Sequence, residues 1–159
     1  MFQPKMRLEL KCVVGFIVNL LKRHDPCLDD VTLDVFGATL RDLLNQHYKH
    51  HWFPDRPNRG SGYRCIRINH KLDPLIGKAG AESGLSEGYL FQSLPHELTL
   101  WVDPGEVSYR IGEDGSVCVM YEHKGHHDRF QKSCKQGYKS RERTKVDTMP
   151  MRQIAAFAS

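Results

Sequence analysis

The residues from Glu97 to Glu122, ELTLWVDPGEVSYRIGEDGSVCVMYE, contain three short apolar-rich segments separated by two turn signals. The tetrapeptide from Asp103 to Glu106 has Pro at its second position and Gly at its third, which is the composition of a type II turn. The pair Asp114-Gly115 supplies a second reversal, because glycine readily adopts the positive φ that a hairpin turn needs. This spacing predicts three antiparallel strands that follow one another along the chain.

Side chains on a strand alternate between the two faces of a sheet, so the first segment has an apolar face and a polar face. With a two-residue loop at Pro104-Gly105, the apolar face pairs Val102 with Val107, Leu100 with Tyr109 and Leu98 with Ile111. Trp101 then lies opposite Ser108 on the polar face, which also carries Thr99, Asp103 and Arg110.

The position of Trp101 allows two interpretations. A large aromatic side chain on the solvent-facing side of a sheet, between a threonine and a carboxylate, is typical of a residue that anchors a protein partner. If a helix or loop covers that face, Trp101 is instead part of the core. The alternation pattern leaves both interpretations open.

Two amphipathic helices are predicted before the sheet. Residues 8–23 repeat apolar side chains at three- and four-residue steps, and Asp25-Pro26 ends that pattern. Asp29 or Asp30 can cap a second helix that extends to about Tyr48. Within it, Leu40, Leu43 and Leu44 have the Leu-x-x-Leu-Leu spacing of coregulator-docking helices, but they also lie on the apolar stripe of the helix, which favours a core role.

The region between the helices and the sheet is rich in aromatic, histidine, proline and glycine residues. Most of 47–62 is predicted to be a loop, followed by a strand from Tyr63 to Ile68 with Ile66 and Ile68 facing the core. Asp73-Pro74 opens a short helix that ends at Ser83-Gly84, and a further helix starts at Ser86-Glu87 and ends near Leu94-Pro95.

The 159 residues correspond to one domain with a tail. Residues 1–122 carry 14 Lys and Arg against 16 Asp and Glu, whereas residues 123–159 carry 9 against 3, so the net charge of +4 comes from the tail. We therefore expect a folded domain over 1–122 and a basic, disordered tail over 123–159. A near-neutral domain argues against specific binding to nucleic acid.

Several features bear on the cellular compartment. No stretch approaches the roughly 18 apolar residues of a membrane span, and the N-terminus lacks the apolar segment of a signal peptide. The five cysteines form no Cys-x-x-Cys motif, and we expect them to be reduced thiols in an intracellular protein.

The sequence offers weak candidates for chemistry. His47, His50 and His51 lie near Cys65 and His70, but the cluster lacks a zincin glutamate, so packed or exposed histidines are favoured over a metal site. The glycines of 59–62 lack the Gly-Lys-Ser/Thr of a phosphate loop, and a strand is expected to follow them. Turn chemistry accounts for most of the carboxylates that could form a two-metal site, namely Asp73, Asp103, Glu106, Glu113 and Asp114. We predict no catalytic residue, no metal site and no cofactor.

Two long blocks resemble the BTG/Tob family of antiproliferative proteins, with the short-tailed BTG branch the better match. The blocks are HYKHHWFPDRPNRGSGYRCIRINHKLDPLI, from His47 to Ile76, and LPHELTLWVDPGEVSYRIGEDGSVCVMYE, from Leu94 to Glu122. The resemblance implies an α+β fold in which an N-terminal helical hairpin and further short helices pack with a small antiparallel sheet. It also implies that the protein is not an enzyme.

The resemblance implies a partner as well. Family members are adaptors that bind the catalytic deadenylase subunit of the cytoplasmic poly(A)-shortening complex, and they thereby modulate mRNA turnover and restrain proliferation. The family's contact surface corresponds here to Tyr63, Asp73, Trp101, Asp103 and Glu113. The alternative function is a transcriptional coregulator that binds DNA-bound factors through the helical hairpin. Both cytoplasmic and nuclear locations are expected, with no membrane partner.

This chain departs from the family pattern at two places. Gly105 occupies a position where the family usually has Tyr or Phe. After Glu122 the sequence matches neither the block through which related proteins engage poly(A)-binding protein nor the long tail motifs of the Tob branch. Recruitment of poly(A)-binding protein is therefore not predicted.

Overall fold

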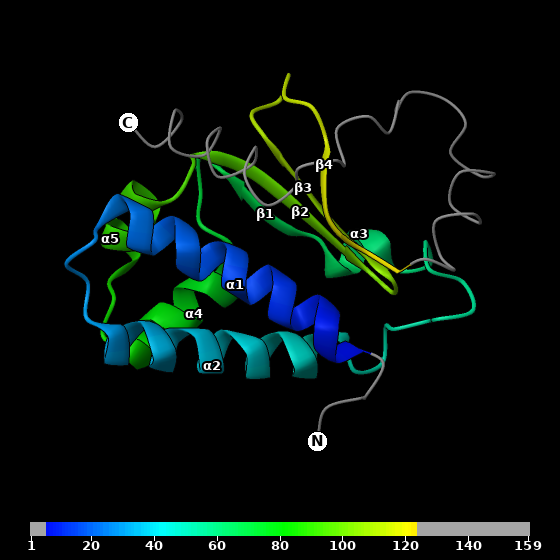
Figure 1. Cartoon of the computed structure of the whole chain (residues 1–159), viewed down its shortest axis with the longest axis horizontal. Coiled ribbons are helices and arrows are strands. Elements are labelled where there is room, and N and C mark those ends of the chain that lie inside the picture. The colour runs from blue at the N-terminus through cyan, green and yellow to red at the C-terminus, as the bar shows by residue number, and fades with distance from the viewer. Residues whose placement is uncertain (1–5, 124–159) are drawn as a thin grey trace.

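The computed structural model describes residues 6–123, and the predicted tail lies almost wholly outside these residues. The helices are α1 (Arg7–His24), α2 (Asp30–Tyr48), α3 (Ser61–Arg64), α4 (Pro74–Ser83) and α5 (Glu87–Ser93). The strands are β1 (Ile66–Asn69), β2 (Glu97–Asp103), β3 (Glu106–Ile111) and β4 (Cys118–Glu122). Figure 1 shows α1 and α2 side by side below the strands, with α5 beside the C-terminal end of α1.

The helical hairpin forms as its sequence predicts. The carboxylate of Asp29 accepts a hydrogen bond from the backbone N–H of Thr32 and caps α2. Lys22, near the end of α1, donates to the carbonyl of Leu28 in the connecting loop and to the carboxylate of Asp30. The loop between the helices is therefore tied to both of them.

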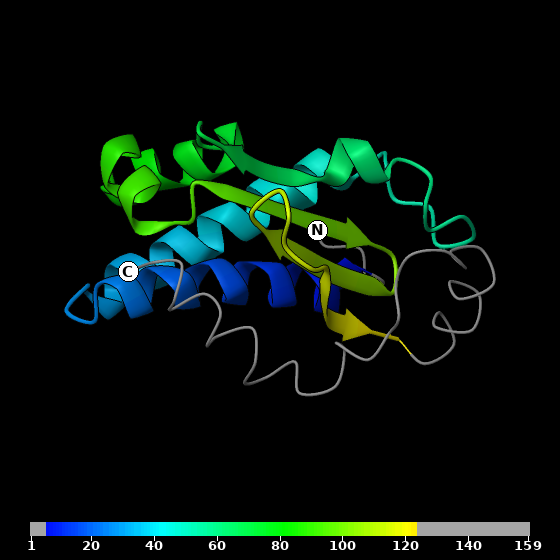
Figure 2. The same ribbon diagram turned by 90° about the horizontal axis from the view of Figure 1, so that it is seen from above.

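The sheet is antiparallel throughout and has the order β1-β2-β3-β4. The predicted register is confirmed, since Val102 pairs with Val107, Leu100 with Tyr109, Leu98 with Ile111 and Trp101 with Ser108. Gly105 has a φ of 84° at the third position of the β2–β3 turn, which is the value a type II turn requires. In Figure 2 the strands lie over part of the helices, and α1 contacts both β2 and β3, so one face of the sheet packs on this helix.

The core lies between the apolar face of the sheet and the helices. Leu10, Val13 and Ile17 of α1 are fully buried. Leu98 and Leu100 of β2 are at most 1% exposed. The ring of Phe16 contacts that of Tyr109, with 4.7 Å between their centroids. Ile76 of α4 and Leu90 of α5 complete the same cluster. The α+β fold class is thus confirmed.

The prediction of a strand over Tyr63–Ile68 is wrong in its first half. Gly60 has a φ of 77° and precedes the single-turn helix α3, so Tyr63 and Arg64 are helical and the strand begins only at Ile66. The expectation that a strand directly follows the glycines of 59–62 is wrong for the same reason. The buried side chain of Arg64 explains this difference, because its acceptors come from the loop before α3 and from β2.

Candidate functional site

The five residues predicted to contact a partner are called here the candidate surface: Tyr63, Asp73, Trp101, Asp103 and Glu113. They come from α3, the cap of α4, β2 and the β3–β4 connection. Three arginines that the sequence analysis did not single out connect them: Arg64, Arg67 and Arg110.

Arg64 is completely buried, and its guanidinium group donates hydrogen bonds to five acceptors. Four acceptors are backbone carbonyls, belonging to His51, Pro57, Arg59 and Val102, at 2.6–2.9 Å. The fifth is the carboxylate of Asp103, whose Oδ1 lies 2.8 Å from Nη2. Since Arg64 follows Tyr63 and Val102 follows Trp101, this side chain fixes the two aromatic residues relative to each other.

Asp103 does not lie on the solvent-facing side of the sheet as the alternation pattern predicted. It is 6% exposed, because α3 and the loop before it cover the end of β2 and bring Arg64 against its carboxylate. A buried carboxylate needs a charged or hydrogen-bonding partner, and Arg64 supplies both. Asp103 therefore supports the candidate surface from inside and presents little area to a partner.

Trp101 is half-buried, between the two interpretations that the sequence left open. Its neighbour across the sheet is Ser108, and the guanidinium carbon of Arg110 lies 5.7 Å from the centroid of its ring. That distance is within the range of a cation–π contact. Part of the indole is supported by neighbouring side chains and part remains open to solvent, as expected of an interface anchor.

Glu113 and Asp73 complete the surface through Arg67. The Glu113 carboxylate lies 3.8 Å from the guanidinium groups of both Arg67 and Arg110, and Glu113 is exposed. The Asp73 carboxylate caps α4 by accepting from the N–H of Leu75 at 2.9 Å, and it also accepts from the N–H of Arg67 at 3.1 Å. Asp73 thus ties α4 to β1, whatever contact it makes with a partner.

The row of Arg67, Thr99 and Arg110 across β1, β2 and β3 explains why the polar face is less exposed to solvent than predicted. These residues are direct cross-strand neighbours, and Thr99 is only 8% exposed. The sequence could have predicted this row, since alternation puts Arg67 and Arg110 on the same face of the sheet as Trp101. Arg64 had no such signal, because the alternation of a strand does not apply to a residue of the helix α3.

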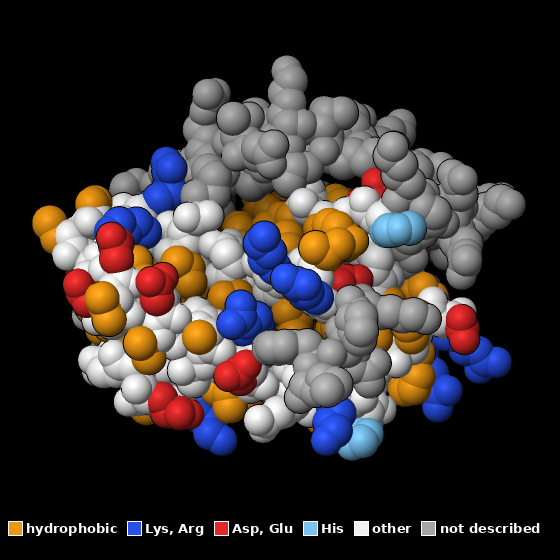
Figure 3. Space-filling view, turned by 60° about the horizontal axis from the view of Figure 1, so that its bottom comes forward, with side chains coloured by type: hydrophobic (Ala, Val, Ile, Leu, Met, Phe, Trp, Pro, Cys, Tyr) orange, Lys and Arg blue, Asp and Glu red, His pale blue; other side chains and the backbone are white. Residues whose placement is uncertain are grey.

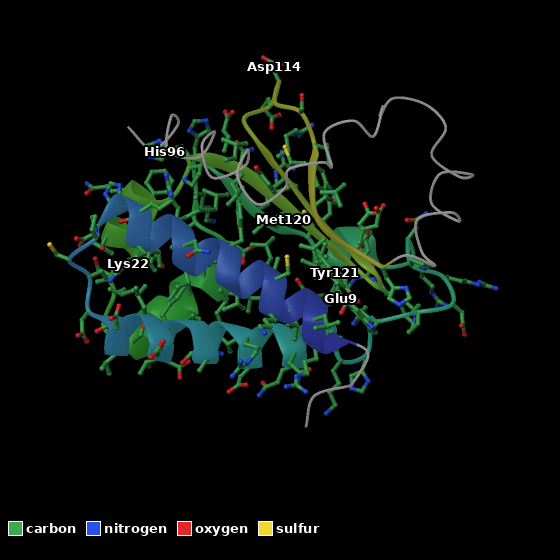
Figure 4. The ribbon with its side chains drawn as sticks, viewed as in Figure 1. Glu9, Lys22, His96, Asp114, Met120 and Tyr121 are labelled. Atoms are coloured by element: carbon green, nitrogen blue, oxygen red, sulfur yellow. The ribbon has the colours of Figure 1, made fainter. Side chains whose placement is uncertain are left out.

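A buried carboxylate in α1 contacts the turn beside this surface. Glu9 is 4% exposed and accepts a hydrogen bond of 2.8 Å from the N–H of Gly105. In Figure 4 it lies at the N-terminal end of α1, beside Tyr121 of β4. Burial raises the pKa of Glu9 above its ordinary value, although the hydrogen bond from Gly105 and the charge of His123 act in the opposite direction.

Cys12 and Cys65 are both half-buried. Burial raises the pKa of the Cys12 thiol to about 11 and also raises that of Cys65, so both thiols are protonated at neutral pH. Within residues 6–123, no three His, Cys, Asp or Glu side chains are grouped as ligands for a metal ion. No helix in this part of the chain is long and apolar enough to cross a membrane.

The leucines of the coregulator-like motif lie mainly in the core. Leu40 and Leu44 are fully buried, and Leu43 is half-buried against the same cluster. The hairpin instead has an open groove between α1 and α2, whose lining includes Lys11, Gly15, Leu33, Asp34 and Gly37. The space-filling view in Figure 3, turned to bring the hairpin side forward, shows Lys and Arg side chains next to apolar ones.

The fold and the arginine-linked surface define an α+β domain, and comparison with known proteins identifies its family. The BTG family model matches residues 6–121. Protein BTG2 of Rattus norvegicus is 60% identical over 114 residues, which are 72% of each chain. Protein BTG1 of Gallus gallus is 60% identical over 114 residues, covering 72% of this chain and 66% of its own length.

Two further matches extend the comparison. Protein Tob1 of Rattus norvegicus is 43% identical over 116 residues, which are 73% of this chain and 31% of that protein. The structure of a BTG/Tob domain of FOG-3 from C. elegans has the same fold, with a TM-score of 0.66 and 22% identity over 84% of this chain and 100% of the other. The chain therefore belongs to the BTG family, and it is an antiproliferative regulatory protein.

Proposed function

We propose that this protein is a non-enzymatic adaptor that binds the catalytic deadenylase subunit of the cytoplasmic poly(A)-shortening complex. Binding would occur through the candidate surface and would modulate mRNA turnover. The observation that carries the proposal is the half-buried Trp101, fixed relative to the exposed Tyr63 by the hydrogen bonds of Arg64. A cytoplasmic location follows from this role, and a nuclear one is also expected.

The composition of the surface supports a protein partner. Interface hot spots are enriched in Trp, Tyr and Arg. Here Arg110 lies against the half-buried Trp101, and both Tyr63 and Arg67 are exposed. Aromatic side chains that are already held in place lose little conformational entropy on binding. The surface is therefore prepared to bind without rearrangement of the backbone.

The competing hypothesis is a transcriptional coregulator that binds through the hairpin. Leu40 and Leu44 have no exposed surface, so these two leucines could contact a partner only if α2 left the core. Contact through the groove of the hairpin would not use these leucines. The adaptor proposal uses residues that are accessible in the folded chain, and we prefer it for that reason.

The experiment measures binding and stability of the same variants. Trp101→Ala should weaken binding to the purified deadenylase subunit by at least about 2 kcal/mol, roughly 30-fold, as for a central interface tryptophan. Because the indole is partly solvent-facing, we expect a loss of stability of only about 1–2 kcal/mol.

Trp52 provides the matched control. It is 8% exposed and packs beside Tyr48, with 6.2 Å between ring centroids, so Trp52→Ala should cost about 3–5 kcal/mol of stability. A Trp101→Ala protein that melts like the Trp52 variant would show that Trp101 is core. A folded variant that binds at wild-type strength would place the adaptor surface elsewhere.

A further inference from the structure

The ring of Tyr63 lies between two histidines. The centroid of His47 is 4.3 Å from that of Tyr63 with an angle of 10° between the planes, and the centroid of His51 is 3.7 Å away with an angle of 17°. If both imidazole rings lay on the same face of the Tyr63 ring, two rings at these distances would collide with each other. The imidazoles therefore cover opposite faces, and the three rings form a single stack.

The backbone beside Tyr63 is held by the same part of the chain. The hydroxyl of Tyr48 donates to the carbonyl of Arg64 at 2.6 Å, and Nη1 of Arg64 donates to the carbonyl of His51 at 2.6 Å. Both contacts are made by residues at or just after the end of α2. The end of α2 thus holds the ring of Tyr63 and the peptide next to it.

The stack does not fill the core. Tyr63 is 45% exposed, and His47 and His51 are only half-buried, outside the cluster of buried apolar residues. A phenol ring on a surface turn would ordinarily be free to change rotamer. Here both of its faces are covered, so what remains accessible is the edge of the ring, in a single orientation.

We propose that His47 and His51 are positioning residues, which hold the edge of Tyr63 in the orientation that the partner binds. This inference rests on the proposed function and adds two residues to it that act through Tyr63. Fixing a side chain before binding removes the entropy cost of ordering it in the complex. Loss of both imidazoles should therefore weaken binding by roughly three- to tenfold, less than loss of Trp101.

The experiment compares removal of the rings with their replacement. His47→Ala/His51→Ala removes both neighbours of Tyr63, and His47→Phe/His51→Phe retains an aromatic ring on each face. His47 lies in the last turn of α2, where alanine favours helix more than histidine does, and His51 lies beyond the end of that helix, so the first variant should leave α2 intact. His50→Ala is the control, because His50 is an exposed histidine of the same segment.

Two quantities are measured for each variant. The first is the proton chemical shift of the Tyr63 ring in the free protein, assigned with Tyr63→Leu, because stacked rings displace it strongly. The second is the affinity for the purified deadenylase subunit. We expect the paired Ala variant to move the Tyr63 resonances toward those of an unstacked tyrosine and to weaken binding, whereas the Phe pair and His50→Ala should retain wild-type affinity.

The outcomes separate this inference from the proposed function. If Trp101→Ala abolishes binding while the paired Ala variant binds normally, the role of the histidines is wrong and the adaptor function stands. Unchanged Tyr63 shifts in the paired Ala variant also overturn the inference, as does a Phe pair that binds as weakly as the Ala pair. If the wild-type chain fails to bind the subunit, the proposed function is wrong and the inference falls with it.

Discussion

Arg64 and Asp103, which are 39 residues apart in the sequence, form a buried ion pair with 2.8 Å between Nη2 and Oδ1. The side chain of Arg64 has no exposed surface, and that of Asp103 is 8% exposed. The remaining guanidinium hydrogens all point to backbone carbonyls. Arg64 therefore fastens α3 and the loop before it to β2, the strand that carries Trp101.

Truncation of Asp103 should destabilise the protein. Asp103→Ala leaves the Arg64 charge buried without its counterion, and breaking one partner of such a pair typically costs about 3–5 kcal/mol. Denaturation by urea, with the midpoint and slope both compared with wild type, measures this loss. Weak binding by this variant would then reflect a disturbed surface, and it would not show that Asp103 contacts the partner.

Asp103→Asn is the control for that substitution. The amide oxygen can still accept the hydrogen bond from Nη2 of Arg64, but the negative charge is lost. We expect its stability to lie between those of wild type and Asp103→Ala. An alanine variant as stable as wild type would show that the four carbonyls alone suffice for Arg64.

The leucines of α2 should respond according to their burial. Leu44 has no exposed surface, and Leu44→Ala should cost about 2–5 kcal/mol of unfolding free energy. Leu43 is half-buried, so Leu43→Ala should cost clearly less. Thermal unfolding of both variants checks the order. A stable Leu44→Ala protein that had lost a nuclear partner would instead favour the coregulator hypothesis.

Two glycines in helices should respond to alanine in opposite directions. A Cβ on Gly80 of α4 would meet the side chain of Leu90 and lie 2.8 Å from the carbonyl oxygen of Leu85, so Gly80→Ala should cost about 1–3 kcal/mol. At Gly15 of α1, no described atom lies within 4 Å of such a Cβ apart from the backbone of α1 and the two chain neighbours.

Gly15→Ala should therefore stabilise the protein by about 0.4–1 kcal/mol, through the lower entropy of the unfolded chain. Midpoints of chemical denaturation compare the two variants directly. Equal shifts in the same direction would contradict the close approach of α4 and α5 at Gly80.

Glu9 should give the protein a measurable dependence on pH. Burial raises its pKa in the folded state, so between the ordinary and the raised pKa the folded chain holds more protons than the unfolded chain. In that window stability falls as the pH rises. Glu9→Gln removes the buried charge and keeps an acceptor for the N–H of Gly105, so it should remove this part of the pH dependence.

The measurement is the difference in unfolding free energy between Glu9→Gln and wild type across pH 4 to 8. We expect the glutamine variant to gain relative stability as the pH rises through the window. A variant that becomes relatively less stable at high pH would show that the charged form of Glu9 is favoured in the folded state.

Local patterns in the sequence predicted most of the fold. The helical hairpin follows from apolar periodicity and the Asp29 cap, and the β2–β3 register follows from the two-residue loop at Pro104-Gly105. These signals are short-range, since each depends on residues that are neighbours in the chain. The α4 cap at Asp73 and the left-handed Gly84 that ends α4 were predictable for the same reason.

The arrangement of the candidate surface could not be predicted in this way. Alternation says that two sides of a strand differ, but it does not say which segment covers the second side, and so it placed Asp103 in solvent. The covering segment depends on Arg64, whose acceptors lie between 5 and 39 residues away. The stacking of Tyr63 on two histidines likewise requires the unforeseen helix α3.

The positive φ of Gly105 makes this position intolerant of a larger side chain. The backbone there has a φ of 84°, and its N–H is held by the carboxylate of Glu9. Any other side chain in that conformation is strained by roughly 1–2 kcal/mol. An aromatic side chain at this position would therefore require either a strained turn or a turn of a different type.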